Sequence, residues 1–508
     1  MTGRGLSIPA PFPPWGFRSR LRDCRVSRGE AAQRGLRRWT VRPGNGCRIP
    51  RIHSDVAFWF SGDASMQGNG RTWRWLWVVL ALAGLLGVGG GEAIPRTAAG
   101  QELAKARPED VGMSSQRLER LDAFLRRAVA EGRTAGAVTM VARRGKVVFS
   151  QAVGMMDREA NRPMSLDAIF RICSMTKPVT SVAVMMLYEE GRLMLDDPVA
   201  KYIPEFGNAK VLAESSGTAT ENSPTVPAKR PITVRHLLNH TSGLTYQWNE
   251  RLGPLYHKAG ITHGLIQDEG TLAEKMKKLA ALPLLHQPGE KYEYGLSIDV
   301  LGYLVEVVSG KTLDEFFRQR IFEPLGMNDT TFFPPKEKLD RLAAVYERSG
   351  PGTLRRMGDE PVVQGSFVYT ADYPQRGPKR YFSGGGGLCS TVPDYMRFCL
   401  MLAGGGRYGN ARLLSRKTVE VMTINQLGDL SVNGNQKFGL GFLVLADRAR
   451  TNLNWSAGSF GWGGFYNTTF LIDPKEQLIV VSMTQLRPGH DCPISEFVPV
   501  LAAQAIAD

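Results

Sequence analysis

Hydrophobic and polar positions follow two periods along the chain, and the strand-like period lies near the two ends of residues 105–508. Apolar residues recur at helical spacing over 113–133, which predicts an amphipathic helix with a leucine stripe. Two β-branched runs follow, joined by a turn at Gly145, and predict a β-hairpin. A second hairpin is predicted over 468–485, with its turn at Asp473-Pro474, ahead of a short apolar helix at about 494–506.

Between the hairpins the pattern is mainly helical. Helices are predicted at 232–239, 299–309 and 313–323, while the polar, Gly- and Pro-rich segments 207–230 and 347–381 are typical of surface loops. Strands at both ends with helices between them favour an α+β fold. We expect an antiparallel sheet from both chain ends, flanked by helices, with a mostly helical inserted region.

A further helix is predicted over 170–195, and its start carries a possible reactive group. Ser174 and Lys177 form the one Ser-x-x-Lys of the chain, and side chains three residues apart on a helix face the same way. Pro178 is tolerated only in the first turn, so the helix should begin near Cys173 or Ser174. Free N–H groups and the helix dipole favour an anion there.

Two interpretations of this pair follow from the residues alone. A lysine in an apolar pocket can accept a proton from a hydroxyl, which would make Ser174 a nucleophile. The alternative is that Ser174 only caps the helix and Lys177 extends to solvent.

Other catalytic patterns are missing from the sequence. No serine stands in Gly-x-Ser-x-Gly, so an α/β-hydrolase triad has no nucleophile. The sequence has no His-Glu-x-x-His and no phosphate-binding loop, and we expect no metal or organic cofactor. His240 is expected to be structural, and glycines 384–387 to form a tight turn where backbone passes closely.

The charge distribution changes the picture of the first hundred residues. The net charge is +15, but residues 1–100 hold fifteen Arg, no Lys and five acids, which leaves about +5 for the remainder. The remainder has no basic stripe interleaved with aromatics, so nucleic acid is not an expected partner. Residues 1–65 are predicted to be a basic low-complexity extension without a fold of its own, either an upstream leader or translation artefact or, alternatively, an organelle transit peptide.

Residues 66–93 have the pattern of a secretory signal peptide. Arg71 and Arg74 precede a 14-residue apolar run at 75–88, and small residues follow. The run is short for a membrane span, so cleavage and export to the periplasm or medium are expected, with membrane contact only if the segment stays uncleaved as an anchor. Residues 105–508 would form the catalytic domain.

The six cysteines have no metal-ligand spacing. Cys24 and Cys47 lie in the extension, and buried thiols are expected for the other four, with a Cys389–Cys399 disulfide as the alternative. These residues are Cys173, Cys389, Cys399 and Cys492.

Six stretches, in order, resemble the serine β-lactamase and penicillin-binding-protein superfamily, and most closely its class C-like branch and the family VIII carboxylesterases. The resemblance covers about residues 105–505. The stretches are "SMTK" at 174–177, "ITVRHLLNHTSGL" at 232–244, "PGEKYEYGLSIDVLGYLVEVVSG" at 288–310, "EPLGMNDT" at 323–330, "GGGGLCST" at 384–391 and "GSFGWGGFYNTTFLIDP" at 458–474.

The resemblance implies a role for individual residues. Ser174 would be the acylated nucleophile, Lys177 its activator, and Tyr294 a general base that shares the proton transfer. The third motif would be Trp462-Gly463-Gly464, with glycines because substrate must approach the strand. The backbone N–H groups of Ser174 and Phe465 would form the oxyanion hole.

Two departures from the family pattern point to the substrate. Leu296 stands where the family has a side-chain amide, and Trp462 stands where it has a cation, so both substrate-binding positions lack a group that would hold an anionic amide. We therefore expect hydrolysis of small-acyl carboxylic esters. The alternatives are a β-lactamase, a D-aminopeptide hydrolase or an acyltransferase using the same site, and a non-catalytic binding protein. The sequence gives no oligomeric state.

Overall fold

The structure is a computed structural model that describes residues 102–213, 217–350, 352–432, 436–447, 453–487, 492 and 494–508. The predictions for residues 1–65 and 66–93, and for Cys24 and Cys47, lie outside these residues. No helix of the described part has the length and apolar character needed to cross a membrane.

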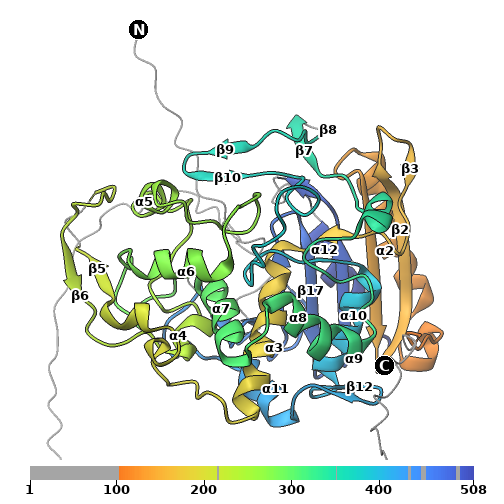
Figure 1. Cartoon of the computed structure of the whole chain (residues 1–508). Coiled ribbons are helices and arrows are strands. Elements are labelled where there is room, and N and C mark those ends of the chain that lie inside the picture. The colour runs from red at the N-terminus through yellow and green to blue at the C-terminus, as the bar shows by residue number, and fades with distance from the viewer. Residues whose placement is uncertain are drawn as a thin grey trace, which may run out of the picture. The chain divides into compact units, whose positions relative to one another are not determined.

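An eight-stranded antiparallel sheet joins the two ends of the described chain (Figure 1). The central seam pairs β1 with β18, and Val138 lies opposite Met483. The strand order across the sheet is β14 (Lys437–Phe438), β15 (Leu443–Val444), β16 (Phe460–Gly464), β17 (Thr468–Asp473), β18 (Leu478–Met483), β1 (Gly136–Arg143), β2 (Lys146–Asp157) and β3 (Arg162–Pro163). Both predicted hairpins and the predicted fold class are confirmed.

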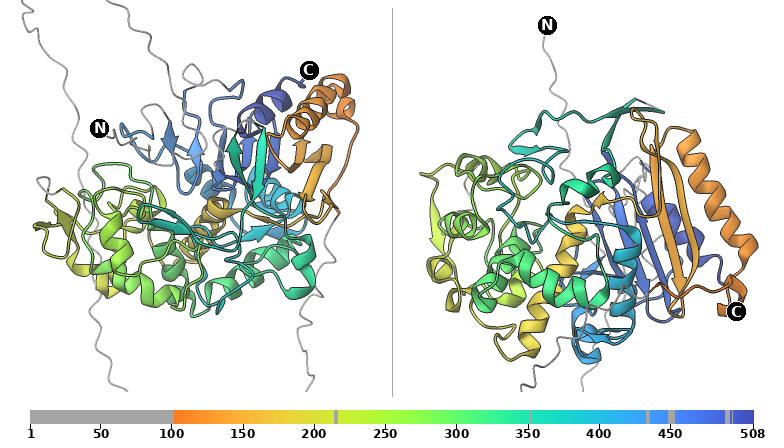
Figure 2. Two further views of the ribbon diagram at one scale, coloured as in Figure 1. Left: turned by 90° about the horizontal axis from the view of Figure 1, so that it is seen from above. Right: turned by 45° about the vertical axis from the view of Figure 1, so that its right-hand side comes forward.

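The sheet separates two hydrophobic clusters because successive side chains point to opposite faces. Ala137 and Val141 of β1 face α2 (Ser115–Ala130) and α12 (Ile494–Ala503), whose apolar residues belong to the same cluster. Val138 and Met140 belong to the larger cluster on the other face. Figure 2 shows α2 on the outer side of the sheet.

Most remaining helices lie on the side of the larger cluster, with α3 (Thr176–Glu189) in the middle. In Figure 1 the sheet lies on one side of α3 and the green helices α4 to α7 on the other. Besides α3, the helices on the side of the larger cluster are α4 (Val234–Leu238), α5 (Gly253–Lys258), α6 (Leu272–Ala280), α7 (Ser297–Ser309), α8 (Leu313–Phe317), α9 (Glu323–Leu325), α10 (Val392–Ala403) and α11 (Arg416–Met422).

The helical part of the stretch 170–195 begins at Cys173, as the position of Pro178 predicted, but the stretch is not helical throughout. Its first residues form β4 (Phe170–Arg171), which pairs with β11 (Cys389–Ser390). A 3-10 turn at Cys173–Met175 follows, and α3 begins at Thr176, which keeps Pro178 in the first turn as expected. The helix ends at Glu189, before Gly191, whose backbone is left-handed with φ 70°.

The segment 347–381 is also less exposed than its polar composition suggested. It contains β8 (Thr353–Arg356), β9 (Val362–Gln364) and β10 (Phe367–Tyr369), and β7 (Tyr346–Gly350) begins one residue before it. Phe367, Tyr369 and Tyr373 are buried and form a cluster with Cys173 and Tyr466. Three aromatic side chains thus fix this segment to the interior although polar residues surround them in sequence.

The other short strands pair outside the main sheet. They are β5 (Lys210–Leu212) with β6 (Thr225–Pro227), β12 (Arg407–Tyr408) with β13 (Ala411–Arg412), and β19 (Leu486–Arg487) with β7. The predicted loop 207–230 therefore includes a small hairpin. Cys173, Cys389, Cys399 and Cys492 are free and buried, which confirms the buried-thiol interpretation.

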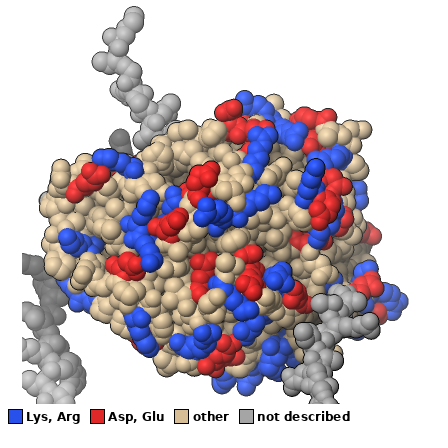
Figure 3. All heavy atoms as spheres, in the orientation of Figure 1, with Lys and Arg blue, Asp and Glu red and all other residues tan. Residues whose placement is uncertain are grey.

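Acidic and basic side chains alternate over the face drawn in Figure 3, without a broad region of one sign. This distribution agrees with the small net charge of residues 101–508.

Candidate active site

Ser174 lies at a sharp change of direction between a strand and a helix. The preceding residue, Cys173, has a left-handed backbone with φ 45°, which costs on the order of 1 kcal/mol for a residue with a side chain. The turn is held from both sides, because Thr468 donates to the carbonyl of Ile172 at 3.3 Å and Tyr395 donates to that of Met175 at 2.9 Å. Ser174 is therefore presented half-buried just ahead of α3.

The structure brings Ser174, Lys177 and Tyr294 together. The hydroxyl of Tyr294 donates to Ser174 Oγ at 2.7 Å, and Lys177 Nζ donates to the same oxygen at 3.2 Å. Lys177 is 1% exposed, so its ammonium lies away from bulk water. The interpretation in which Lys177 extends to solvent is wrong.

Lys177 has two further acceptors that the sequence analysis missed. Its Nζ donates to Tyr246 OH at 3.0 Å and to the carbonyl of Gly385 at 2.7 Å. With Ser174 Oγ, these oxygens provide one acceptor for each of the three N–H bonds of an ammonium. Gly385 belongs to the predicted tight turn, but nothing in the sequence pointed to its carbonyl, and Tyr246 lies two residues beyond a matched stretch.

Aromatic rings surround Tyr294 and hold it in place. Its ring centroid lies 4.9 Å from that of His240 and 5.4 Å from that of Trp462. Trp248 stacks on it at 6.2 Å, and Lys177 Nζ lies 4.6 Å from its centroid on the ring face. Rings that are packed on several sides leave the hydroxyl little freedom to turn away from Ser174.

His240 packs against the aromatic rings of Tyr292, Tyr294 and Phe438. Burial, and then the charge of Lys177, hold its pKa well below the usual value, so the imidazole is neutral at physiological pH. Neither ring nitrogen has a hydrogen-bond partner among the described residues. The structural interpretation of His240 therefore fits its environment.

Trp462 and Leu296 lie deeper than a direct contact with substrate would require. Trp462 is 2% exposed and packs between Tyr294 and Phe438, and Leu296 is fully buried just before α7. Their side chains leave little surface for a ligand. Compared with the family pattern, Trp462 replaces a cation and Leu296 replaces a side-chain amide. Trp462 also packs against the ring of Tyr294.

Packing gives Gly464 of the third motif a second reason to be glycine, which the sequence did not indicate. A Cβ on Gly464 would lie 2.4 Å from the carbonyl oxygen of Ile172, so the strand packs directly on the segment that carries Ser174. Gly463 pairs with Thr469, and Gly464, paired with Thr468, is the last residue of β16. Phe465 follows outside the strand ladder, where its N–H is not required for sheet pairing.

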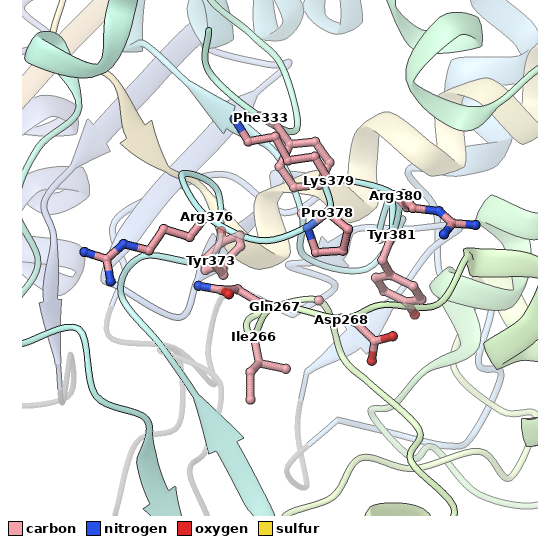
Figure 4. Close-up of a pocket in the computed structure, with 12 residues that line it drawn as sticks. Ile266, Gln267, Asp268, Phe333, Tyr373, Arg376, Pro378, Lys379, Arg380 and Tyr381 are labelled. Atoms are coloured by element: carbon pink, nitrogen blue, oxygen red, sulfur yellow. The ribbon is translucent and has the colours of Figure 1, made fainter. Parts of the chain in front are cut away.

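A separate, small pocket is lined by residues that include Gln267, Tyr373 and Arg380 (Figure 4). Its lining contains Tyr381 and Gly387 but not Ser174, Lys177 or Tyr294, so we assign no acyl chemistry to it. The described residues contain no group of three His, Cys, Asp or Glu side chains placed to hold a metal ion.

Comparison with known proteins agrees with this geometry. The family model described as Beta-lactamase matches residues 121–503. Esterase EstB of Burkholderia gladioli is 34% identical over 371 residues, which cover 72% of this chain and 89% of EstB. The structure of EstCE1, a hydrolase with promiscuous acyltransferase activity, superposes with a TM-score of 0.66 at 28% identity, over 77% of this chain and 98% of EstCE1. Simvastatin synthase LovD of Aspergillus terreus has a TM-score of 0.62 at 25% identity, over 76% and 98% of the two chains.

Fold, site and relatives define a hydrolytic enzyme with the β-lactamase and transpeptidase-like architecture. The chain belongs to the Beta-lactamase family. The resemblance found in the sequence is confirmed, and relatives of the chain carry out ester hydrolysis or acyl transfer.

Proposed function

We propose that this protein hydrolyses small-acyl carboxylic esters through an acyl-enzyme on Ser174. One observation carries the proposal: Ser174 Oγ accepts hydrogen bonds from both Tyr294 OH and Lys177 Nζ. A hydroxyl held between two proton-transfer groups at the start of a helix has the arrangement of an activated nucleophile.

The reaction would proceed in two steps that share one site. Ser174 Oγ attacks the ester carbonyl and gives its proton to Tyr294 or Lys177, whichever is unprotonated once substrate is bound. The oxyanion forms between the N–H groups of Ser174 and Phe465. As it collapses, the C–O bond to the alcohol breaks and the stored proton goes to the leaving oxygen. Water then attacks the acyl-enzyme and loses a proton to the same groups. The bond between the acyl carbon and Ser174 Oγ breaks, the proton returns to Ser174 Oγ, and the acid leaves.

The absence of a cation and of a side-chain amide favours a neutral ester over a β-lactam or a D-aminopeptide. A carboxylate-bearing substrate is usually held by a cation and an amide, and the corresponding positions carry Trp462 and Leu296. An ester also has a better leaving group than a peptide, so it needs less protonation. The names of EstB and EstCE1 support the same direction.

Acyl transfer to an alcohol is the second candidate, because LovD is a synthase and EstCE1 is described with acyltransferase activity. The same acyl-enzyme would then be attacked by an alcohol in place of water. A purely binding role is disfavoured by the hydrogen bonds that join Ser174, Lys177 and Tyr294.

The test compares p-nitrophenyl butyrate with nitrocefin for the wild type and for Ser174→Ala, with Ser150→Ala as a control on the sheet. Ester turnover that is lost only in Ser174→Ala supports the proposal. Nitrocefin turnover as fast as ester turnover would favour a β-lactamase. A rise in transesterified product when an alcohol is added would favour the transferase, and no turnover with no acyl adduct on Ser174 would leave only a binding role.

The proposal extends to the start of the chain. We propose that residues 66–93 direct export and that 105–508 form the catalytic domain, on the basis of the charge and apolar run of that segment. Sequencing the N-terminus of the mature protein tests this. A start shortly after residue 93 supports cleavage, and a start within the first residues contradicts it.

A further inference from the structure

Asp299 is a buried carboxyl close to the proposed catalytic groups, in the first turn of α7. It is 0% exposed, and no lysine or arginine of the described chain lies within ion-pair distance of it. Its Oδ1 accepts from Ser383 Oγ at 2.6 Å and from the N–H of Gly385 at 3.2 Å, while Oδ2 has no hydrogen-bond partner among the described residues. Burying a carboxyl in this way is unfavourable for folding, so stability alone does not explain the position.

The two partners of Asp299 belong to the glycine turn whose carbonyl holds Lys177. The N–H of Gly385 is bound to Asp299, and its carbonyl accepts from Lys177 Nζ at 2.7 Å, the shortest of the three bonds of Lys177. On the other side of the turn, Thr180 donates to the carbonyl of Gly384 at 2.7 Å. The turn is therefore fastened between α7 and α3.

Asp299 and Tyr246 both lie close to the backbone of Gly385. A Cβ on this residue would lie 2.2 Å from Asp299 Oδ2 and 3.2 Å from Tyr246 OH, so there is no room for a side chain between them. Gly385 and Tyr246 are both acceptors for Lys177.

We propose that Asp299 is the positioning residue of Lys177: it fixes the glycine turn so that the Gly385 carbonyl holds the ammonium beside Ser174. The proposal rests on the proposed function, since it assigns Lys177 a part in ester turnover. Asp299 itself touches neither Ser174 nor the reacting atoms; it acts through Gly385.

The protonation state of Asp299 matters for this role. Burial raises the pKa of Asp299 to about 6, against the opposing effects of Ser383, of the Lys177 charge and of the Gly385 N–H. Tyr246 and Tyr381 also face the carboxyl; burial raises the pKa of both hydroxyls, and the charge of Asp299 adds to the rise. Both donors bind Oδ1, so protonation at Oδ2 keeps the two hydrogen bonds but removes the negative charge that strengthens them.

The experiment measures kcat and KM for p-nitrophenyl butyrate in Asp299→Asn, Asp299→Ala and Ser383→Ala, over about pH 5 to about pH 9. Asp299→Asn keeps an acceptor oxygen but removes the negative charge, so we expect kcat to fall about 10-fold with KM nearly unchanged. Any change of kcat with pH near 6 should also disappear. Asp299→Ala loses both acceptors and should lose about 100-fold in kcat. Ser383→Ala should show a smaller loss of the same kind.

The matched control is Asp394→Asn. Asp394 is 4% exposed, and burial raises its pKa to about 6. It accepts from the N–H of Asp329 and the hydroxyl of Thr330 and, unlike Asp299, lies 3.4 Å from an arginine, Arg397. This variant should keep the wild-type kcat. Wild-type kcat and pH profile in Asp299→Asn and Ser383→Ala would overturn the proposal, even if Asp299→Ala fails to fold. A wild type without Ser174-dependent ester turnover would instead overturn the proposed function.

Discussion

The hydroxyl of Tyr294 donates a 2.7 Å hydrogen bond to Ser174 Oγ across 120 residues of sequence. The bond joins the segment before α7 to the start of α3, two helices that pack in the same core cluster. Because both residues precede helices that pack into the core, the distance between them is set by the core rather than by a mobile loop.

Replacing Tyr294 tests whether this bond carries proton transfer. Tyr294→Phe removes the hydroxyl and keeps the ring against His240 and Trp462, so we expect kcat for a p-nitrophenyl ester to fall about 100-fold or more with little change in KM. Tyr292→Phe is the control, because the Tyr292 hydroxyl is buried without a partner among the described residues. Equal activity of the two variants would contradict the role of Tyr294.

Tyr246 offers a second test at the other side of Lys177. Tyr246→Phe leaves the ammonium with one acceptor fewer in a buried site, and an unsatisfied charged donor costs about 1–3 kcal/mol. We expect kcat to fall about 10-fold or more, together with slower acylation of Ser174 by a fluorophosphonate probe. Tyr256→Phe removes a buried hydroxyl elsewhere and should leave both rates unchanged.

Gly464 tests the contact between β16 and the nucleophile segment. In Gly464→Ala the new methyl group would collide with the Ile172 carbonyl, which lies 2.4 Å from the ideal Cβ position. We expect a loss of about 1–3 kcal/mol in the free energy of unfolding and a fall in kcat, since the strand and Ser174 must separate. Gly350→Ala, where a Cβ meets nothing within 4 Å, should change neither quantity. A fully active and stable Gly464→Ala would show that the contact is not needed.

The raised pKa of the buried Asp394 carboxyl predicts how the free energy of unfolding changes with pH. Burial raises its pKa from 3.8 to about 6, so between these values the folded protein binds more protons than the unfolded chain. The free energy of unfolding contributed by this group is therefore highest below about pH 4 and is lost as the pH rises through about 6. Buried histidines with lowered pKa values act in the opposite direction, so the whole-protein curve does not isolate Asp394.

The measurement is the difference between wild type and Asp394→Asn in urea unfolding at several pH values. The wild type should lose up to about 3 kcal/mol relative to the variant between about pH 4 and about pH 7.5. A difference that stays constant over this range would show that Asp394 does not titrate as its burial requires.

The sequence predicted those parts of the site that depend on local spacing or on matched motifs. Ser174 and Lys177 are three residues apart, and the position of Pro178 correctly limited where α3 could begin. Tyr294 required the family resemblance, because an aromatic residue before a helix carries no signal of its own. Both hairpins were predictable because apolar residues alternate along them.

The contacts that were missed depend on packing between distant segments. The bonds from Lys177 to Tyr246 and to Gly385 span 69 and 208 residues, and backbone carbonyls have no sequence signature. The segment 347–381 was taken for a surface loop because its few buried aromatics are diluted by polar neighbours. The burial of Trp462 also depends on Phe438, which comes from another strand of the sheet.

The seam between β1 and β18 has a consequence for how the protein is made. A ribosome releases β1, β2 and α3 early, and Ser174 and Lys177 with them. The strand that pairs with β1, β18, is synthesised near the end. The Thr468 hydroxyl that holds the Ile172 carbonyl comes 296 residues later. The edge of β1 that pairs with β18 has no partner until then, so the site can be completed only after β16 to β18 have emerged.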